Sequence, residues 1–283
     1  MKKFFKIKSL AKINISLNVI KKLKSQFHKI ESLITFVKLH DVIYIRNIKS
    51  KKHKIFFKGK FSKGIKSKNT ISNLLQIIDR KKLSNEKKFE INIIKNIPQK
   101  SGMGGGSMNA ASLLNFLIKK KIVKLNNKEL VNLCNSIGSD VIFGIDIRNS
   151  IMSSNNKISR YKKKLNLYVL IVKPNFGCST KFIYSEVSEF TKSKYNTPSV
   201  KFFDLDYMSN SNNDLEPVAF KNYPKLKALK LSLMKLPNVA FARMTGSGST
   251  ILAYFKTKKT CDIAYKELKK RYKNYWCIVS KTI

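Results

Sequence analysis

The stretch that decides the fold is Pro98-Gln99-Lys100-Ser101-Gly102-Met103-Gly104-Gly105-Gly106-Ser107. It lies between an alternating segment at 89–95, which predicts a strand, and an apolar stripe at 107–120, which predicts a helix. Glycine permits positive φ and leaves no Cβ, so backbone N–H groups can converge on an anion. The N-terminus of the following helix adds unpaired N–H groups and the positive end of its dipole. The pattern therefore predicts a phosphate cradle.

Other glycine-rich loops do not fit this stretch. A Walker A loop needs Gly-Lys-Ser/Thr after its glycines, and none follows here. A dinucleotide fingerprint would need a third glycine at the position of Ser107. A flexible linker is disfavoured, because a well-patterned helix follows at once.

A second informative segment, at 11–19, alternates strictly between apolar and polar residues. This period predicts a half-buried strand. Lys12 and Asn14 would then project from the same face, about 7 Å apart.

The rest of the chain predicts a mixture of strands and helices. A helix at 127–137 is indicated by its apolar face and by a capping box of Asn126 and Glu129. Gly138 suits a left-handed helix end, so Asp140 would lie just beyond the helix. The segment 182–214 is polar and is expected to form surface loop and short helix. Further strands are predicted at 42–47, 54–57, 165–173, 250–255 and 275–279, and further helices at 225–235 and 260–270. The fold class is therefore α+β with two domains.

Composition argues against a membrane protein. Of the 283 residues 43% are hydrophobic, and the longest unbroken apolar run, Leu167 to Val172, is far short of a membrane span. The four cysteines show no C-x-x-C spacing, which favours reduced thiols and a cytoplasmic location.

The formal net charge is +42, which by itself would suggest a nucleic-acid partner. Only six of the 58 basic residues are arginine, and the lysines are spread along the whole chain. Lys, Ile, Asn and Phe all have AT-rich codons, so codon bias explains the composition. No specific nucleic acid is expected, because arginine is the better residue for base and phosphate contacts.

Three motifs together resemble those of the GHMP kinases, the family of galactokinase, homoserine kinase and mevalonate kinase. They are Ala11-Lys12-Ile13-Asn14, the loop Gly102 to Ser107 with Met108-Asn109-Ala110-Ala111, and the turn Thr245-Gly246-Ser247-Gly248. The resemblance implies an N-terminal domain like the second domain of ribosomal protein S5, at 1–160, and a ferredoxin-like C-terminal domain at 161–283. It also implies ATP and Mg²⁺. Within the family, the motifs are most similar to the branch that phosphorylates the 2-hydroxyl of a cytidylyl alcohol on the non-mevalonate route to isoprenoid precursors.

The resemblance also assigns roles to individual residues. Asp140, in Gly138-Ser139-Asp140, matches the family's catalytic aspartate, and Lys12 matches its catalytic lysine. Asp140 would take the proton of the substrate hydroxyl, while Lys12 would orient it and stabilise the transferring group. Ser107 is expected to face the phosphates or Mg²⁺. The nucleotide is expected at Asn69, Lys95, Pro98, Gln99, Lys100, Ser101, Gly102, Met103, Gly104, Gly105, Gly106, Ser107, Met108 and Asn109, and the substrate at Asn14, Phe27, His28, Thr180, Gly246 and Ser247.

Some positions depart from the family pattern, and two other functions stay open. Lys100 and Ser101 replace small residues, Met108 replaces a common serine, and Phe27 lacks a tyrosine hydroxyl. The alternatives are another GHMP kinase with a different acceptor, or an RNA-binding protein with an S5-like domain. The motifs are compatible with a monomer or a homodimer.

Overall fold

The computed structural model describes residues 3–24 and 27–283, which form two compact units. Unit 1 comprises Met1–Lys12, Leu39–Pro98 and Gly104–Ile147, and unit 2 comprises Ile13–Lys38, Gln99–Met103 and Arg148–Ile283. Two long strands, β1 (Phe5–Lys22) and β2 (His28–Ile48), each contribute residues to both units. The compact units therefore do not follow one cut in the chain, and a family boundary between residues 160 and 161 stays a prediction.

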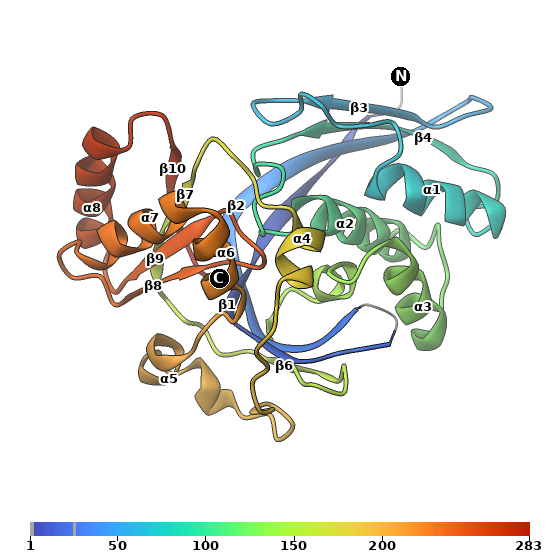
Figure 1. Cartoon of the computed structure of the whole chain (residues 1–283). Helices are drawn as coiled ribbons and strands as arrows, with labels where there is room; N and C mark the ends of the chain where they lie inside the picture. Colours follow the sequence, from blue (N-terminus) through green and yellow to red (C-terminus); the bar gives the residue numbers. More distant parts are fainter. Residues whose placement is uncertain (1–2, 25–26) are drawn as a thin grey trace. The chain divides into compact units, whose positions relative to one another are not determined.

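In unit 1, three strands lie side by side. β4 (Lys88–Ile94) pairs antiparallel with the second half of β2 and parallel with β3 (Lys54–Lys58). β4 alternates between buried and half-buried residues, as its sequence predicts. The helices of the unit are α1 (Thr70–Arg80), α2 (Gly105–Lys119) and α3 (Asn127–Ile137), followed by the short 3-10 helix η1 (Val141–Ile145) (Figure 1).

The core of unit 1 forms where these helices bury their apolar faces. In α1 the buried residues recur at helical spacing, as Ile71, Leu74, Leu75 and Ile78. The η1 segment approaches α2 so closely that a Cβ on Gly144 would lie 2.6 Å from the Cβ of Ala111. This close packing holds the end of η1 against α2.

Unit 2 contains an antiparallel sheet in the order β10-β7-β9-β8, with β7 (Tyr168–Lys173), β8 (Phe241–Met244), β9 (Ile251–Phe255) and β10 (Trp276–Lys281). Helices fall between β7 and β8 and between β9 and β10, which is the β-α-β-β-α-β arrangement of a ferredoxin-like domain. β5 (Asn149–Met152) pairs with the first half of β2 and with β6 (Ile158–Tyr161). The helical segments are α4 (Thr180–Ser185), η2 (Val200–Phe203), α5 (Leu205–Asn210), α6 (Leu215–Asn222), α7 (Pro224–Met234) and α8 (Lys258–Arg271) (Figure 1).

The strand predicted at 11–19 is confirmed as part of β1, but its half-buried character was wrong, because its polar face is buried too. Lys12 is 3% exposed, Asn14 5% and Ser16 0%. The polar side chains have partners that the sequence does not reveal: the Ser16 hydroxyl is hydrogen-bonded to the hydroxyl of Tyr195 at 2.8 Å. Burial of polar groups costs little when they are hydrogen-bonded in this way.

Two further local predictions can be compared with the structure. The capping box of α3 is confirmed: the Asn126 side chain accepts from the backbone N–H of Glu129, and the Glu129 side chain accepts from that of Asn126. The left-handed helix end predicted at Gly138 was wrong, since its φ of 167° is extended. The segment 182–214 is largely loop and short helix, but six of its side chains are buried rather than on the surface, namely Ile183, Val187, Tyr195, Phe203, Met208 and Asn213.

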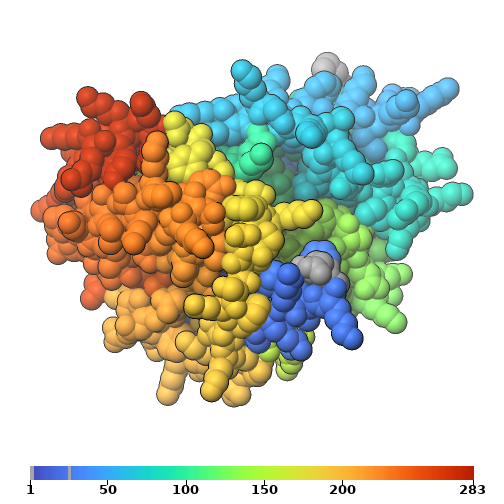
Figure 2. All heavy atoms as spheres, in the orientation of Figure 1, coloured from blue at the N-terminus to red at the C-terminus, as the bar shows by residue number. Residues whose placement is uncertain are grey.

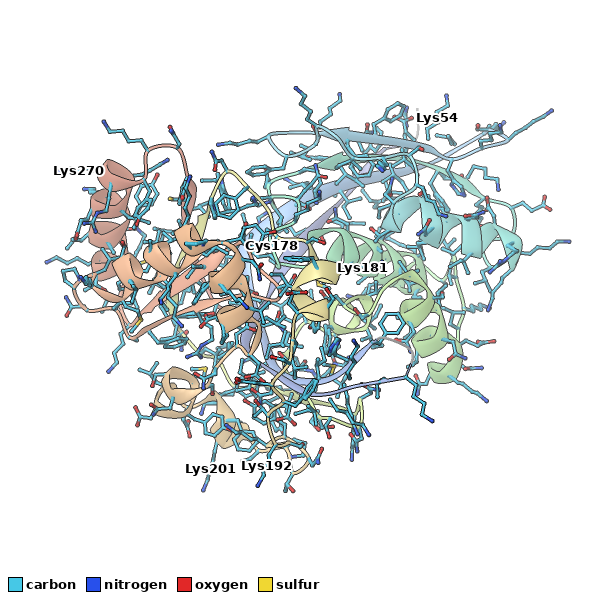
Figure 3. All side chains as sticks on the ribbon, in the orientation of Figure 1. Lys54, Cys178, Lys181, Lys192, Lys201 and Lys270 are labelled. Atoms are coloured by element: carbon cyan, nitrogen blue, oxygen red, sulfur yellow. The ribbon has the colours of Figure 1, made fainter. Side chains whose placement is uncertain are left out.

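The basic residues are dispersed over many elements. Long side chains stand out from the surface over α1 and the segment that follows it (Figure 2). Exposed lysines also come from β3, α4, η2 and α8, represented by Lys54, Lys181, Lys201 and Lys270 in Figure 3. None of the described helices is long and apolar enough to cross a membrane. All four cysteines lie among the described residues, are buried, and form no disulfide.

Candidate active site

The centre of the candidate site in unit 1 is an ion pair between Lys12 of β1 and Asp140 at the start of η1. The Lys12 Nζ lies 2.9 Å from Asp140 Oδ2. The lysine side chain is 4% exposed, whereas that of Asp140 is 34% exposed. The carboxylate is therefore accessible to a ligand, while the lysine is positioned behind it. Asn115 of α2 fixes the far end of η1 by donating to the carbonyls of Gly144 and Ile145 at 3.1 and 2.8 Å.

The glycine loop lies directly against this pair. Gly104 has a φ of +63°, and a Cβ there would lie 3.3 Å from Lys12 Cε and 3.4 Å from Asp140 Oδ2. Gly104 is also the N-cap of the 15-residue helix α2, and as a glycine it provides no capping side chain. The first N–H groups of α2 are thus available to an anion next to the pair, as the sequence predicts for a phosphate cradle.

Ser107 lies in the same cluster. A Cβ on Gly138 would be 3.5 Å from the Ser107 hydroxyl oxygen, so this hydroxyl lies beside the turn that leads to Asp140. Within the described part of the chain, no group of three or more His, Cys, Asp or Glu side chains could hold a metal ion. The hydroxyl of Ser107 nevertheless fits Mg²⁺, which in kinase sites takes one or two protein oxygens and completes its shell with phosphate and water.

Lys95, which the family resemblance assigns to the nucleotide, forms a buried ion pair with Asp41. Asp41 is 0% exposed and also accepts hydrogen bonds from the backbone N–H groups of Asn96 and Ile97, at 2.7 and 2.8 Å. The pair thus anchors the backbone that leads into the glycine loop. Asp41 was missed by sequence reasoning, because nothing local to residue 41 marks it as the partner of residue 95.

Asn69 caps helix α1 in the structure. Its side-chain oxygen accepts from the N–H groups of Ile71 and Ser72, and its amide nitrogen donates to the carbonyls of Lys66 and Ser67. Both ends of the amide are therefore engaged, and its contact with a nucleotide stays a prediction. The next residue, Thr70, donates from its hydroxyl to the Gly106 carbonyl at 2.7 Å and so links α1 to the glycine loop.

The remaining loop residues differ in accessibility. Met108 and Asn109 are 1% and 2% exposed within α2, so neither presents an accessible surface to a nucleotide, and their contact with it stays a prediction. Pro98, Ser101 and Met103 are buried as well, whereas Gln99 and Lys100 are exposed. A Cβ on Gly105 would lie 3.0 Å from the side chain of Ile97.

In unit 2, Asn14 is held by hydrogen bonds from both its side chain and its backbone. Its side-chain amide donates to the Ser32 hydroxyl at 2.8 Å, and its backbone N–H donates to the Thr245 hydroxyl at 2.9 Å. Thr180, at the start of α4, is hydrogen-bonded through its hydroxyl to that of Ser247 at 2.8 Å. The structure therefore brings Thr180 and Ser247 together, and it joins Asn14 to the turn that contains Ser247.

His28, at the start of β2, has two aromatic neighbours. Its ring centroid lies 5.3 Å from that of Tyr184 and 6.5 Å from that of Phe190, with the latter ring stacked. Burial, with a smaller effect of the Lys22 charge, lowers the pKa of His28 below its ordinary value. The imidazole is therefore neutral near pH 7, and its buried Nε2 has no hydrogen-bond partner among the described residues.

Aromatic side chains around His28 present accessible faces. Phe27 is 74% exposed and Phe190 is 46% exposed. Tyr184 and Phe190 were missed by sequence reasoning, because the segment 182–214 holds seven aromatic residues and nothing local marks these two as neighbours of His28. Phe190 lies in a loop that Glu31 holds, because the buried Glu31 carboxylate accepts from the backbone N–H groups of Lys194 and Tyr195.

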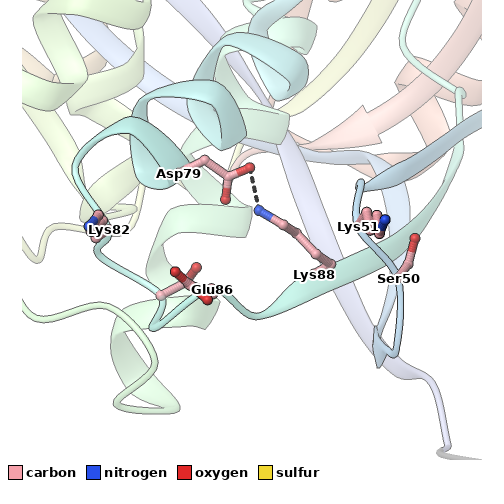
Figure 4. Close-up of a pocket in the computed structure, with 7 residues that line it drawn as sticks. Ser50, Lys51, Asp79, Lys82, Glu86 and Lys88 are labelled. Atoms are coloured by element: carbon pink, nitrogen blue, oxygen red, sulfur yellow. Dashed lines mark ion pairs between the residues drawn. The ribbon is translucent and has the colours of Figure 1, made fainter.

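A separate cavity in unit 1, of about 350 Å³, lies at the other end of α1 (Figure 4). It is lined by Asp79 and Lys88, which form an ion pair of 2.7 Å, and by Lys82 and Glu86. Thr70, whose hydroxyl contacts the glycine loop, begins the same 11-residue helix, so the cavity and the loop are separated by roughly 15 Å of helix. This cavity is not part of the candidate active site.

Comparison with family models supports the resemblance found in the sequence. Residues 69–152 match the GHMP kinases N terminal domain, and residues 202–274 match the GHMP kinases C terminal model. Two solved structures share the fold over nearly the whole chain. A 4-(cytidine 5'-diphospho)-2C-methyl-D-erythritol kinase has a TM-score of 0.79 at 20% identity and covers 98% of this chain and 99% of its own. Homoserine kinase from Cytophaga hutchinsonii ATCC 33406 has a TM-score of 0.72 at 16% identity, with coverage of 100% and 95%.

Two relatives are similar along most of their length. The 4-diphosphocytidyl-2-C-methyl-D-erythritol kinase of Pelagibacter ubique (strain HTCC1062) is 56% identical over 279 residues, which is 99% of each chain. That of Petrotoga mobilis (strain DSM 10674 / SJ95) is 32% identical over 254 residues, covering 87% of this chain and 96% of its own. The chain thus has the α+β fold and the sequence motifs of a GHMP kinase, a small-molecule kinase that uses ATP. It belongs to the 4-diphosphocytidyl-2-C-methyl-D-erythritol kinase family.

Proposed function

We propose that the chain transfers the γ-phosphoryl group of ATP to the 2-hydroxyl of 4-diphosphocytidyl-2-C-methyl-D-erythritol, on the non-mevalonate route to isoprenoid precursors. The observation that carries this proposal is the Lys12–Asp140 pair at 2.9 Å, placed against Gly104 at the N-terminus of α2. A base, a fixed cation and an anion cradle in one cluster are the groups that phosphoryl transfer needs.

In this mechanism Asp140 accepts the proton of the attacking hydroxyl. Its accessible carboxylate is oriented by the ammonium of Lys12, which is buried and so has little freedom to move. The positive charge of Lys12 also stabilises the negative charge that develops on the transferring group.

The first N–H groups of α2 hold the phosphates of ATP, and the helix dipole adds to their attraction for the anion. Lys95 neutralises the buried Asp41, which prevents an uncompensated negative charge beside the cradle. The residue that would hold Mg²⁺ is Ser107. When bound, Mg²⁺ would neutralise charge on the phosphate oxygens.

Recognition of the alcohol is assigned to unit 2. A neutral His28 offers one hydrogen-bond donor and one acceptor, which suits the edge of a cytosine ring. The accessible faces of Phe27 and Phe190 suit stacking on the same base. Asn14, Thr180, Gly246 and Ser247 are proposed to contact the polar remainder of the substrate.

The test is a kinase assay with Mg·ATP against a panel of alcohols. We expect turnover of the cytidylyl alcohol and little with homoserine, mevalonate or galactose. In His28→Ala, KM for the cytidylyl alcohol should rise about 5- to 150-fold, equivalent to the loss of roughly 1–3 kcal/mol of base contact, while KM for ATP stays nearly unchanged. Absence of turnover, combined with tight RNA binding that resists salt, would refute the proposal in favour of a nucleic-acid function.

A further inference from the structure

Thr245, which the proposed chemistry does not use, lies at the start of the second glycine turn and is 0% exposed. Its hydroxyl accepts a hydrogen bond from the backbone N–H of Asn14 at 2.9 Å and donates one to the Gly102 carbonyl at 3.2 Å. A single buried oxygen therefore joins strand β1 to the glycine loop. Asn14 is proposed to contact the alcohol, and Gly102 belongs to the nucleotide loop.

The backbones of Gly102 and of the turn at Thr245 and Gly246 are also in close contact. A Cβ on Gly102 would lie 2.0 Å from the Thr245 carbonyl oxygen, and Gly102 has a φ of +71°. A Cβ on Gly246 would lie 3.1 Å from the Gly102 carbonyl oxygen. Two glycines from separate motifs thus let their backbones meet, and the hydroxyl of Thr245 is hydrogen-bonded to the Gly102 carbonyl at this contact.

The turn that carries Thr245 is itself held in place. The side-chain amide of Asn213 donates to the carbonyls of Met244 and Gly246, each at 2.8 Å, and Asn213 is 2% exposed. The backbone N–H of Thr245 also donates to the Thr250 carbonyl at 3.1 Å. Thr245 is therefore a fixed point from which Asn14 and Gly102 are both oriented.

We infer that Thr245 is a positioning residue that holds the nucleotide loop and the acceptor-binding strand in register. This inference rests on the proposed function, because it takes Asn14 and Gly102 as parts of the two binding sites. The role needs a hydroxyl, which can accept and donate at the same time. Serine keeps both abilities, whereas valine has the shape of threonine and neither ability.

The test compares Thr245→Val with Thr245→Ser and with a matched control, Thr250→Val. Thr250 lies in the same turn, is 0% exposed, and its hydroxyl has no hydrogen-bond partner among the described residues. The two valine variants therefore make the same chemical change in the same surroundings. Only Thr245→Val leaves a buried N–H and a partly buried carbonyl without their partner.

We expect Thr245→Val to raise KM for both ATP and the cytidylyl alcohol and to lower kcat/KM about 10- to 100-fold. Thr245→Ser should stay within about threefold of the wild type, because both hydrogen bonds are kept, and Thr250→Val should match the wild type. If Thr245→Val does not fold, Thr245→Cys, whose thiol is a weak donor and acceptor, should show a smaller rise in both KM values.

Three outcomes would overturn the inference in an active enzyme. In the first, Thr245→Val behaves like Thr250→Val. In the second, its melting temperature falls while both KM values stay unchanged. In the third, KM changes for only one of the two substrates. If Thr245→Cys is the variant measured, KM values equal to those of Thr245→Ser would overturn it too. A wild-type protein without kinase activity would instead refute the proposed function, and nucleotide affinity measured by calorimetry on the same variants would then test whether Thr245 holds the loop.

Discussion

The two glycine-rich segments look alike in the sequence and work differently in the structure. In the first, the Cβ that Gly104 lacks would meet the side chains of Lys12 and Asp140, at 3.3 and 3.4 Å. In the second, the Cβ that Gly246 lacks would meet the backbone of Gly102, at 3.1 Å. The first segment thus brings a helix N-terminus close to reactive side chains, and the second lets two turns pack together. A glycine motif alone does not distinguish a ligand cradle from a close backbone contact.

The largest expected effect tests whether the first segment lies beside the chemistry. Asp140→Asn should lower kcat by about 10²–10⁴, because an amide cannot act as the general base. The affinity for ATP, measured by calorimetry, and the melting temperature should change little, since Asn keeps the size and can still contact Lys12. A kcat within a few-fold of the wild type would show that Asp140 is not the base.

An intermediate effect is expected for Gly104→Ala, which places a methyl group against the Lys12–Asp140 pair at a φ of +63°. The left-handed backbone costs about 1–2 kcal/mol for alanine, and displacement of the pair should lower kcat by roughly tenfold or more, given the sensitivity of catalysis to misplacement.

The control for this variant is Gly64→Ala, where φ is +80° but nothing lies within 4 Å of the added Cβ. It carries the same kind of backbone strain without contact with the pair. Its melting temperature should fall, while steady-state kcat should stay at the wild-type value. Equal losses of kcat in both variants would mean that strain, rather than contact with Lys12 and Asp140, explains the effect.

The smallest effect is expected at Thr70, whose hydroxyl contacts the first segment through the Gly106 carbonyl at 2.7 Å. Thr70→Val should raise KM for ATP only about two- to tenfold, because one hydrogen bond is lost at a site where water can replace it. KM for the cytidylyl alcohol should not change. This pattern would contrast with Thr245→Val, for which both KM values are expected to rise. A rise in KM for the alcohol in Thr70→Val would remove the distinction between the two segments.

Much of the fold could be predicted because its signals are local. The helix at 127–137 was predicted with the bounds that α3 has, since its capping box joins residues only three apart. The strands predicted at 54–57 and 89–95 correspond to β3 and β4. The whole of helix α1 was missed as an element, although Asn69 and Ser72 form a capping box at its start and its buried apolar residues recur at helical spacing. These local signals follow directly after a lysine-rich stretch that indicates a loop.

The sequence by itself determined the α+β class, the glycine loop before a helix, and the candidate pair Lys12 and Asp140, because these depend on periodicity and on family motifs. The tertiary structure alone decided which polar groups meet. Asn14 and Thr245 are 231 residues apart in the sequence, and the ion-paired residues Lys95 and Asp41 are 54 residues apart. Periodicity in the sequence does not reveal such pairs, since each forms only after distant segments have been packed together. A buried polar group must then be matched by whichever neighbour the fold provides.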